Sequence, residues 1–197
     1  MTDPGRSHAP GHFERIYAAN ADPWDYLGSA YESAKRDATI EALRDRRYAS
    51  GLEVGCSIGV LTRRMADRCD RLLAIDFIDD ALVGARAACV DRQHVSFQNM
   101  RVPAEWPDGA FELIVLSEVL CFLSASDNLA LVGRCKDALA PSGEILLVNW
   151  LGDAPGDPCS GNEAASCFIA AAGSWLRVGL HRKTDRYRID RLERRVR

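Results

Sequence analysis

The alternation of short apolar runs with amphipathic stretches is the feature that most constrains how this chain can fold. Five runs have the length of β-strands: Leu52–Gly55, Leu72–Asp76, Val95–Gln98, Phe111–Ser117 and Ile145–Trp150. Between them lie three stretches of helix length, around Val60–Arg68, Asp80–Val90 and Asn128–Leu139, and one loop-rich connection, Asn99–Ala110. Such alternation predicts an α/β fold with a doubly wound, mostly parallel sheet that helices cover on both faces.

The end of the chain follows a different pattern. Apolar and polar residues alternate over Leu176–Leu180 and again over Tyr187–Ile189, with the polar segment 183–186 between them. Two alternating runs around a short turn predict an antiparallel hairpin, which we expect at an edge of the sheet. Ahead of the hairpin, a Pro/Gly-rich loop is expected to lead into a short helix that ends near Gly173.

Basic residues are concentrated in this predicted hairpin. Residues 177–197 contain nine Lys or Arg against three Asp or Glu, although the whole chain has a formal charge of −3. One interpretation is a patch for an anionic ligand or a nucleic acid. The other, which we favour, is a solvated edge whose charges discourage aggregation. Because the chain as a whole is acidic, we expect no nucleic-acid partner.

The region ahead of the sheet is expected to be a helical cap. Residues 1–12 are rich in Pro, Gly, His and Ser, which predicts disorder. Residues 13–197 are expected to form a single domain, with the helical cap at 13–48 and the sheet at 49–197. Within the cap, Ser29 and Glu32 have the spacing of a capping box at the start of a helix.

The composition fits one soluble domain. The chain has 197 residues, of which 47% are hydrophobic, enough for one ample core. No apolar run approaches the roughly 20 residues that span a bilayer, and residues 1–12 lack an apolar signal segment, so we expect a cytoplasmic protein without membrane insertion. Seven cysteines without a CxxC pair predict reduced, mostly packed thiols, and four scattered histidines predict no metal site.

A glycine-rich turn follows the first predicted strand. In residues 53–59, EVGCSIG, Gly55 and Gly59 would let the backbone approach a ligand closely. The spacing differs from the GxGxxG turn of dinucleotide sites, which argues against a nicotinamide-dependent reductase. Asp76 ends the second strand about twenty residues later, where a carboxylate accepts hydrogen bonds from ribose hydroxyls. An Asp here is also typical of a helix cap, but its distance from the turn favours the ribose interpretation.

Together these residues resemble the class I S-adenosylmethionine-dependent methyltransferases. The resemblance covers residues 50–194, and it implies a Rossmann-like, seven-stranded sheet with a terminal antiparallel hairpin. Within that superfamily the chain looks most like the nodulation protein S family, on DPWDYLGSAYESAKRDATIEAL in the cap, LEVGCSIGVLTRRMADRCDRLLAID at the glycine turn and LSEVLCFL after the fourth strand. That family is known for N-methylation of the free amine of a de-N-acetylated glucosamine in a chitooligosaccharide.

The resemblance implies a set of residues for S-adenosylmethionine, with S-adenosylhomocysteine as the product. Gly55 to Gly59 would pass the methionine part, Asp76 would hold the ribose, and Phe77 would flank the adenine. The loop Asn99–Val102 would close on the adenine edge, and Ser117 would face the transferred methyl group. The full set is Glu53, Gly55, Cys56, Ser57, Gly59, Asp76, Phe77, Asn99, Met100, Arg101, Val102 and Ser117.

Two positions depart from the family pattern. Arg101 stands where the family usually has an Asp that accepts from the adenine amino group, so that contact would come from the backbone or from Asn99. Cys121 stands where the family tends to have an aromatic residue. Neither departure touches the predicted ribose or methionine contacts.

The candidates for binding the methyl acceptor are one acidic residue and several aromatic residues. Glu118 directly follows the fourth strand and is the candidate for orienting or deprotonating an acceptor amine, although a carboxylate here also suits a cap of the next turn. Sugar rings stack on flat aromatic faces, and Trp24, Tyr31 and Trp150 are the candidates for a substrate lid, with Trp24 and Tyr31 favoured because they lie on the cap.

We therefore expect an enzyme with a small-molecule or oligosaccharide acceptor. An alternative is a methyltransferase of the same family that acts on another small molecule or glycan, since acceptor choice depends on loops. A second alternative, of another class, is a regulatory protein that binds S-adenosylmethionine without catalysis. The intact Glu53, Gly55, Gly59 and Asp76 argue against that alternative.

Overall fold

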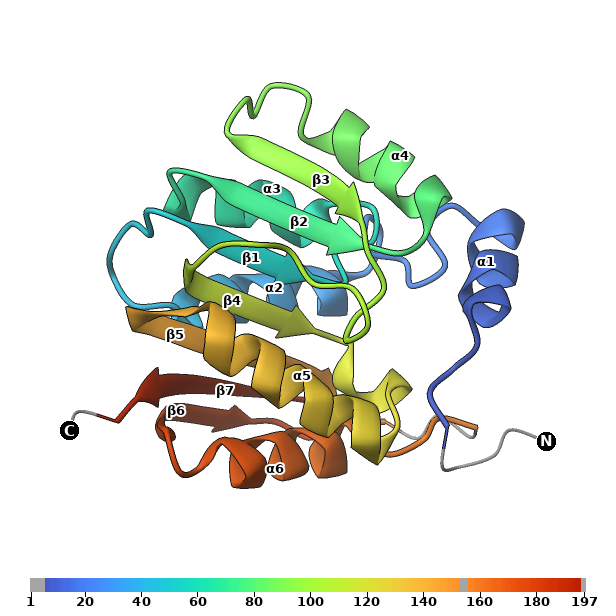
Figure 1. The fold of residues 1–197 in the computed structure, drawn as a ribbon. Helices are drawn as coiled ribbons and strands as arrows, with labels where there is room; N and C mark the ends of the chain where they lie inside the picture. The colour runs from blue at the N-terminus through green and yellow to red at the C-terminus, as the bar shows by residue number, and fades with distance from the viewer. Residues whose placement is uncertain (1–5, 153–155, 196–197) are drawn as a thin grey trace.

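The computed structural model describes residues 6–152 and 156–195. Its centre is a seven-stranded sheet formed by β1 (Gly51–Val54), β2 (Leu72–Asp76), β3 (Val95–Asn99), β4 (Phe111–Ser117), β5 (Leu139–Trp150), β6 (Leu176–Lys183) and β7 (Tyr187–Arg194). The strand order is β3-β2-β1-β4-β5-β7-β6, and Figure 1 shows the strands from one edge of the sheet to the other. The first five strands are parallel, and β7 is antiparallel to both β5 and β6. The doubly wound sheet and the terminal antiparallel hairpin are therefore confirmed.

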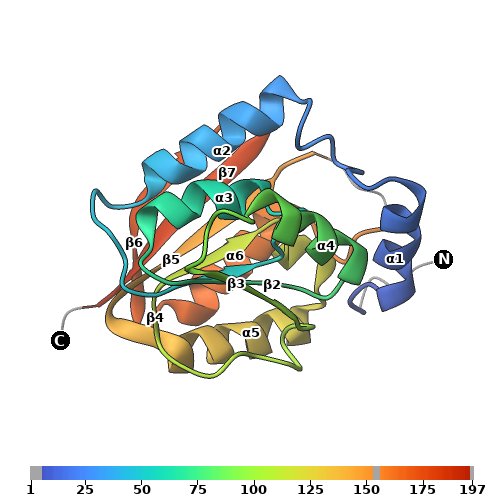
Figure 2. The same ribbon diagram turned by 90° about the horizontal axis from the view of Figure 1, so that it is seen from above.

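Helices cover both faces of this sheet. They are α1 (Pro10–Ala19), α2 (Ala30–Ala42), α3 (Val60–Met65), α4 (Asp79–Ala88), α5 (Ala125–Ala138) and α6 (Gly161–Ala172), with single 3-10 turns at Ala66–Arg68 and Leu120–Phe122. Seen from above in Figure 2, α2 and α3 lie on one side of the sheet and α5 on the other, where α6 packs beside it. The connection from β3 to β4 contains no helix, as its loop-rich sequence predicted.

The core consists of two apolar layers, one on each face of the sheet. Along β4, Leu113 and Val115 pack toward α2 and α3, whereas Ile114 and Leu116 pack toward α5 and α6. Successive residues of a strand point to opposite faces, so a run that is apolar at every position suits a strand buried on both sides. Each fully buried Leu or Ile contributes roughly 1.5–3 kcal/mol to folding. Packing on both faces holds the strands rigidly, so the residues at their carboxyl ends have fixed positions relative to one another.

The fifth strand begins earlier than its apolar run predicted. β5 starts at Leu139, which pairs with Phe111, and the next pair joins Glu144 to Leu113. The register shifts between these pairs, so that Pro141 to Gly143, which lie ahead of the predicted strand, form an irregularity within β5.

The basic side chains of the hairpin serve the fold. Arg177 pairs with Glu193 at 2.6 Å, and Arg188 pairs with the buried Asp190 at 2.6 Å. Arg194 donates to backbone carbonyls at the end of α5 and the start of β5. These cations have partners within the fold, which argues against an open patch for an anionic ligand or a nucleic acid.

The N-terminal segment is ordered further toward the start of the chain than predicted. Helix α1 begins at Pro10, a residue suited to a first helical position because its missing N–H would have no partner there. Residues 6–9 precede it and contact other loops, which corrects the prediction of disorder for residues 6–12; residues 1–5 lie outside the described residues. Among the described residues, no helix is long and apolar enough to cross a membrane.

Candidate active site

A cavity of about 1200 Å³ opens at the carboxyl ends of the central strands. It lies where the strand order reverses between β1 and β4, which is the position of ligand sites in doubly wound sheets. Helix α1 lies at this same end of the sheet (Figure 1). Most of the exposed lining is apolar, and polar groups converge on it from β2, β4 and α2. An apolar cavity with a few polar groups is typical of a small-molecule site.

The glycine turn lines one wall of the cavity, but its two glycines have different structural roles. Gly55 has φ +78°, and a Cβ there would lie 2.5 Å from Cγ2 of Val119, so only glycine fits beside the cavity. Gly59 has φ +80°, and a Cβ there would lie 2.8 Å from Cα of Ala85 on α4. Gly59 is not among the lining residues, so it allows α3 and α4 to pack rather than a ligand to approach.

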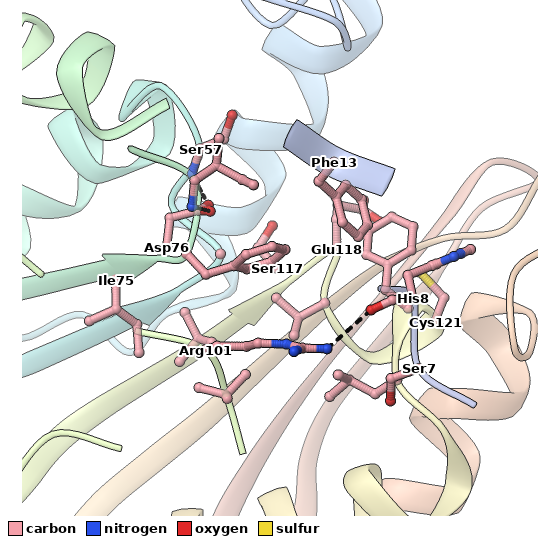
Figure 3. A pocket seen from close by; sticks show the side chains of 18 of the residues that line it. Ser7, His8, Phe13, Ser57, Ile75, Asp76, Arg101, Ser117, Glu118 and Cys121 are labelled. Carbon is pink, nitrogen blue, oxygen red and sulfur yellow. Dashed lines mark hydrogen bonds between the residues drawn. The ribbon is translucent and has the colours of Figure 1, made fainter. Parts of the chain in front are cut away.

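Asp76 is held in place by the backbone of two loops. Its Oδ2 accepts from the N–H of Ser57 at 2.8 Å, and its Oδ1 accepts from the N–H of Ile78 at 3.1 Å. Figure 3 shows the contact with Ser57 on the cavity wall. Burial raises the pKa of Asp76 above its ordinary value, against the opposing effect of these N–H donors. Each carboxylate oxygen keeps further acceptor capacity, which fits two ribose hydroxyls.

Glu53 and Cys56 lie beneath the turn, beside a smaller cavity that adjoins the main one. Burial raises the pKa of Glu53 to about 8, and nearby Asp76 adds to the effect. Its Oε2 has no hydrogen-bond partner within the described residues. Glu53 is therefore mostly a neutral acid at pH 7 and does not face the main cavity as a charge.

Glu118 has a strained backbone and a fixed carboxylate. Its φ of +55° is unusual for a residue with a side chain. Its Oε1 accepts from Nζ of Lys35 on α2 at 2.7 Å, and its Oε2 accepts from the N–H of Trp150 at 2.8 Å. The carboxylate thus joins the cap to the ends of β4 and β5 and lines the cavity. It accepts from these distant donors rather than capping the next turn.

The first helix covers the cavity with aromatic residues. The Tyr17 hydroxyl bonds Oγ of Ser57 at 2.5 Å, and burial raises the pKa of Tyr17 to about 12. Phe13 packs edge-on against Phe77 and Phe122, with ring centroids 5.7 and 4.9 Å away. These contacts hold α1 across the glycine turn at one side of the cavity.

The segment ahead of α1 crosses the outer wall of the cavity. His8 bonds Asp157 through Nε2 at 2.8 Å, and its carbonyl accepts from the Arg101 guanidinium at 3.3 Å (Figure 3). Its ring stacks on His12 with centroids 4.3 Å apart. Burial, followed by the charge of His8, lowers the pKa of His12, so that ring is neutral near pH 7. Arg101 thereby ties the loop after β3 to the N-terminal segment.

Most of the predicted site residues meet at the main cavity. Its lining includes Trp24, Gly55, Ser57, Asp76, Phe77, Met100, Arg101, Val102, Ser117, Glu118 and Trp150. Cys121 lines it as well, and burial raises the pKa of its thiol well above the ordinary value, so the thiol stays protonated.

Two predicted residues point elsewhere. The Asn99 amide donates to Oδ1 of Asp79 at 2.7 Å, at the start of α4, and Asn99 is not among the residues that line the cavity. Tyr31 lies against the terminal hairpin, where the Arg186 guanidinium stacks 3.5 Å from its ring centroid. The prediction of Tyr31 as a substrate lid is corrected, because its ring covers Arg186 and does not line the cavity.

The sequence interpretation missed the residues that close the site. They come from the N-terminal segment, from both cap helices and from the loop after β5: Ser7, His8, His12, Phe13, Tyr17, Glu32, Lys35 and Asp157. A signal for α1 was present, since Phe13 and Tyr17 are four residues apart on one helical face and Pro10 marks a helix start. Asp157 carries no comparable local signal.

The strand order, the cavity and the carboxylate at the end of β2 define the fold class of the S-adenosylmethionine-dependent methyltransferases. Among solved structures, N-methyltransferase NodS from Bradyrhizobium japonicum WM9 with S-adenosyl-L-homocysteine aligns with a TM-score of 0.81 at 21% identity, covering 93% of this chain and 97% of that one. A putative methyltransferase from Pseudomonas syringae aligns with a TM-score of 0.71 at 31% identity, covering 85% of this chain and 100% of that one.

The sequence comparisons narrow this class to one family. The family model described as nodulation protein S matches residues 12–148. Nodulation protein S of Rhizobium tropici is 33% identical over 128 residues, which are 64% of this chain and 53% of that protein. The chain belongs to the nodulation protein S family, and it spans about half the length of the curated relatives it matches.

Proposed function

We propose that this protein is an S-adenosylmethionine-dependent N-methyltransferase that methylates the free amine of a de-N-acetylated glucosamine in a chitooligosaccharide. The observation that supports binding of the cofactor is the position of Asp76. Backbone N–H groups hold both of its carboxylate oxygens at the cavity wall, and each oxygen can still accept a hydrogen bond from a ribose. Family membership supports the acceptor class, since a relative of the same fold is an N-methyltransferase.

The residues of this chain suit such a cofactor at several points. Gly55 leaves space for the methionine part beside Ser117, and Phe77 with Met100 presents apolar surface for the adenine. S-adenosylmethionine supplies a methyl group on a positively charged sulfur. Asp76 and Glu118 make the wall near that position negative, which favours a cation.

The protein's contribution to the transfer would be positioning. An amine lone pair attacks a sulfonium methyl without covalent help from a side chain, so orientation and an unprotonated amine are what the site must provide. We assign orientation of the amine to Glu118, because Lys35 and the Trp150 N–H fix its carboxylate at the end of β4. Helix α1 would exclude water, and the exposed ring of Trp24 at the cavity mouth would pack against a sugar.

The test is a methyl-transfer assay followed by mass spectrometry. The protein is incubated with S-adenosylmethionine and either a deacetylated or a fully acetylated chitooligosaccharide. We expect a gain of one or more methyl groups on the deacetylated oligosaccharide only, at the non-reducing end. If S-adenosylhomocysteine binds but no deacetylated oligosaccharide gains mass, the acceptor is another small molecule or glycan. Binding without turnover across a broad acceptor panel would instead identify a non-catalytic binding protein.

A further inference from the structure

One buried carboxylate oxygen on the wall of the cavity has no partner. Glu32 lies on α2 and is only 8% exposed. Its Oε1 pairs with Nζ of Lys35 at 3.0 Å, whereas its Oε2 has no hydrogen-bond donor within the described residues. Leaving a buried carboxylate oxygen without a donor is costly, so such an atom on a cavity wall points to a donor that a ligand brings.

Glu32 has this open oxygen because it does not complete the predicted capping box. The Ser29 hydroxyl accepts from the N–H of Glu32 at 3.3 Å, so it caps α2. The Glu32 side chain turns away from the helix start to pair with Lys35 instead. The sequence pattern therefore predicted the cap correctly but gave the Glu32 carboxylate a role that it does not have.

The neighbouring charges define what the donor must be. Lys35 bridges Glu32 and Glu118, which places one ammonium between two carboxylates. Burial opposes the charge of Lys35, but the two carboxylates outweigh it and raise the pKa of Lys35 above its ordinary value. Arg36, which also lines the smaller cavity, donates to the Tyr26 carbonyl at 2.8 Å. The free oxygen of Glu32 thus belongs to a pair of carboxylates that already binds one ammonium group.

This cluster lies where the main cavity meets the smaller one. Glu32, Lys35 and Glu118 line both cavities, as do Gly55 and Ser117. A group bound at Glu32 would therefore lie beside the glycine turn and the end of β4, where the proposed cofactor and the proposed acceptor meet.

We propose that Oε2 of Glu32 accepts a hydrogen bond from the primary ammonium group of a bound ligand. An ammonium group is a positively charged donor without acceptor atoms, so it matches an unpartnered carboxylate oxygen better than a hydroxyl or an amide does. The proposal rests on the proposed function, which offers two sources of this chemistry: the α-ammonium group at the methionine end of the cofactor, and the amino group of an amino-sugar acceptor.

The first arm of the test compares two ligands that differ in the amino-acid end. Wild type and Glu32→Gln are titrated calorimetrically with S-adenosylhomocysteine and with 5′-methylthioadenosine, which keeps the nucleoside and the thioether but lacks the ammonium group. If the cofactor is the source, Glu32→Gln weakens S-adenosylhomocysteine binding about 10- to 100-fold and leaves methylthioadenosine binding unchanged. Equal weakening of both ligands would overturn the proposal, because the effect would then not depend on the ammonium group.

The second arm tests the acceptor. D-glucosamine and N-acetylglucosamine are titrated into wild type and Glu32→Gln, with and without saturating S-adenosylhomocysteine. If the acceptor is the source, wild type binds glucosamine in preference to its N-acetyl form, and Glu32→Gln loses that preference. A Glu32→Gln variant that matches wild type in both arms would overturn the proposal.

Matched variants separate binding from folding. Glu41→Gln removes an exposed carboxylate from the same helix, where it pairs with Arg182 at 3.4 Å, and should bind all four probes as wild type does. Glu32→Asp keeps the charge but shortens its reach, so it should give an intermediate loss. If wild type binds neither S-adenosylhomocysteine nor 5′-methylthioadenosine, the proposed function fails. The titration with glucosamine in the absence of S-adenosylhomocysteine still tests the ammonium site.

Discussion

Two groups of buried charges in this protein contain the same kinds of residue but differ in how completely they are paired. On the sheet, Arg44 reaches Glu144 at 3.0 Å and Glu193 at 2.7 Å, and Arg188 reaches Asp190 at 2.6 Å. Oε2 of Glu144 makes no hydrogen bond, but Nε of Arg44 lies 3.0 Å from it and balances its charge. In the cavity, Oε2 of Glu32 has no hydrogen-bond partner among the described residues and lies on the wall where a ligand could supply one.

This difference in pairing distinguishes charges that stabilise the fold from a carboxylate that has an acceptor atom free for a ligand. A buried charge is tolerated when it is paired and hydrogen-bonded, so the sheet group needs nothing further. Glu32 carries an unpaired acceptor on the cavity wall where a ligand is expected, and that acceptor costs stability in the free protein. Removing a sheet charge should therefore damage folding, and removing a cavity charge should damage binding or catalysis.

The largest effect is expected for Arg188→Met. This change removes the Arg188 partner of the buried Asp190, which is left with the His181 ring at 2.6 Å, and it removes the bond from Arg188 to Ser166 at 2.8 Å, so the free energy of unfolding should fall by about 3–5 kcal/mol. Affinity for S-adenosylhomocysteine, measured where the variant is folded, should not change. Urea unfolding checks the first expectation. Arg182→Met on the same hairpin removes an exposed pair and should cost less than about 1 kcal/mol.

The next effect concerns Glu53 and pH. Burial raises its folded pKa to about 8 from 4.5, so its contribution to stability is fully present below about pH 4.5 and is lost as the pH rises toward 8. Between about pH 5.5 and 7.5, wild type should lose up to about 3 kcal/mol through this residue. Glu53→Gln should be flatter over that window in urea titrations at several pH values. Parallel curves for the two proteins would show that Glu53 ionises normally.

A third prediction concerns the carboxylate at the end of β4. If Glu118 orients the acceptor amine, Glu118→Gln should lower kcat/KM for methyl transfer about 100-fold, and because the buried Lys35 loses one of its two carboxylate partners, the free energy of unfolding should also fall by about 1–3 kcal/mol. Glu112→Gln, at the opposite end of the same strand, is the control and should keep full activity. Unchanged turnover in Glu118→Gln would limit that residue to joining the cap to the sheet.

The smallest effect is expected for Tyr17→Phe. It removes one hydroxyl that bonds Ser57 and should cost about 1 kcal/mol of stability. Because that bond holds α1 across the glycine turn, S-adenosylhomocysteine affinity should fall by a factor of about 2 to 5. Thermal unfolding and calorimetry check both values. A loss of affinity as large as that for an Asp76 variant would mean that Tyr17 contacts the ligand directly.

The sheet and the wall of the cavity formed by β1 and β2 were predictable from the sequence because local signals encode them. A run that is apolar at every position indicates a strand buried on both faces, and β2 and β4 begin and end where their runs do. Gly55 and Asp76 could be identified as cavity residues because a glycine turn and a carboxylate at strand ends are local features at the usual position of a ligand site.

The side of the site toward the cap was less predictable because its contacts join distant parts of the chain. His8 meets Asp157 across 149 positions, and Lys35 meets Glu118 across 83. No local pattern predicts such pairs. Tyr31 and Gly59 show the opposite error, in which a local pattern suggests a site residue that packs elsewhere. Tyr31 packs against Arg186, and Gly59 packs against α4, so each has a structural role.

The most direct test of the account is a calorimetric titration of S-adenosylhomocysteine into wild type, Asp76→Ala and Asp80→Ala. Asp80 is an exposed residue of α4 close to Asp76, and its variant is the control. We predict micromolar binding by wild type and Asp80→Ala, and at least a roughly 100-fold loss in Asp76→Ala, because two charged hydrogen bonds to the ribose disappear. Equal affinity in Asp76→Ala, or no binding by wild type, would contradict the assignment of this cavity to S-adenosylmethionine.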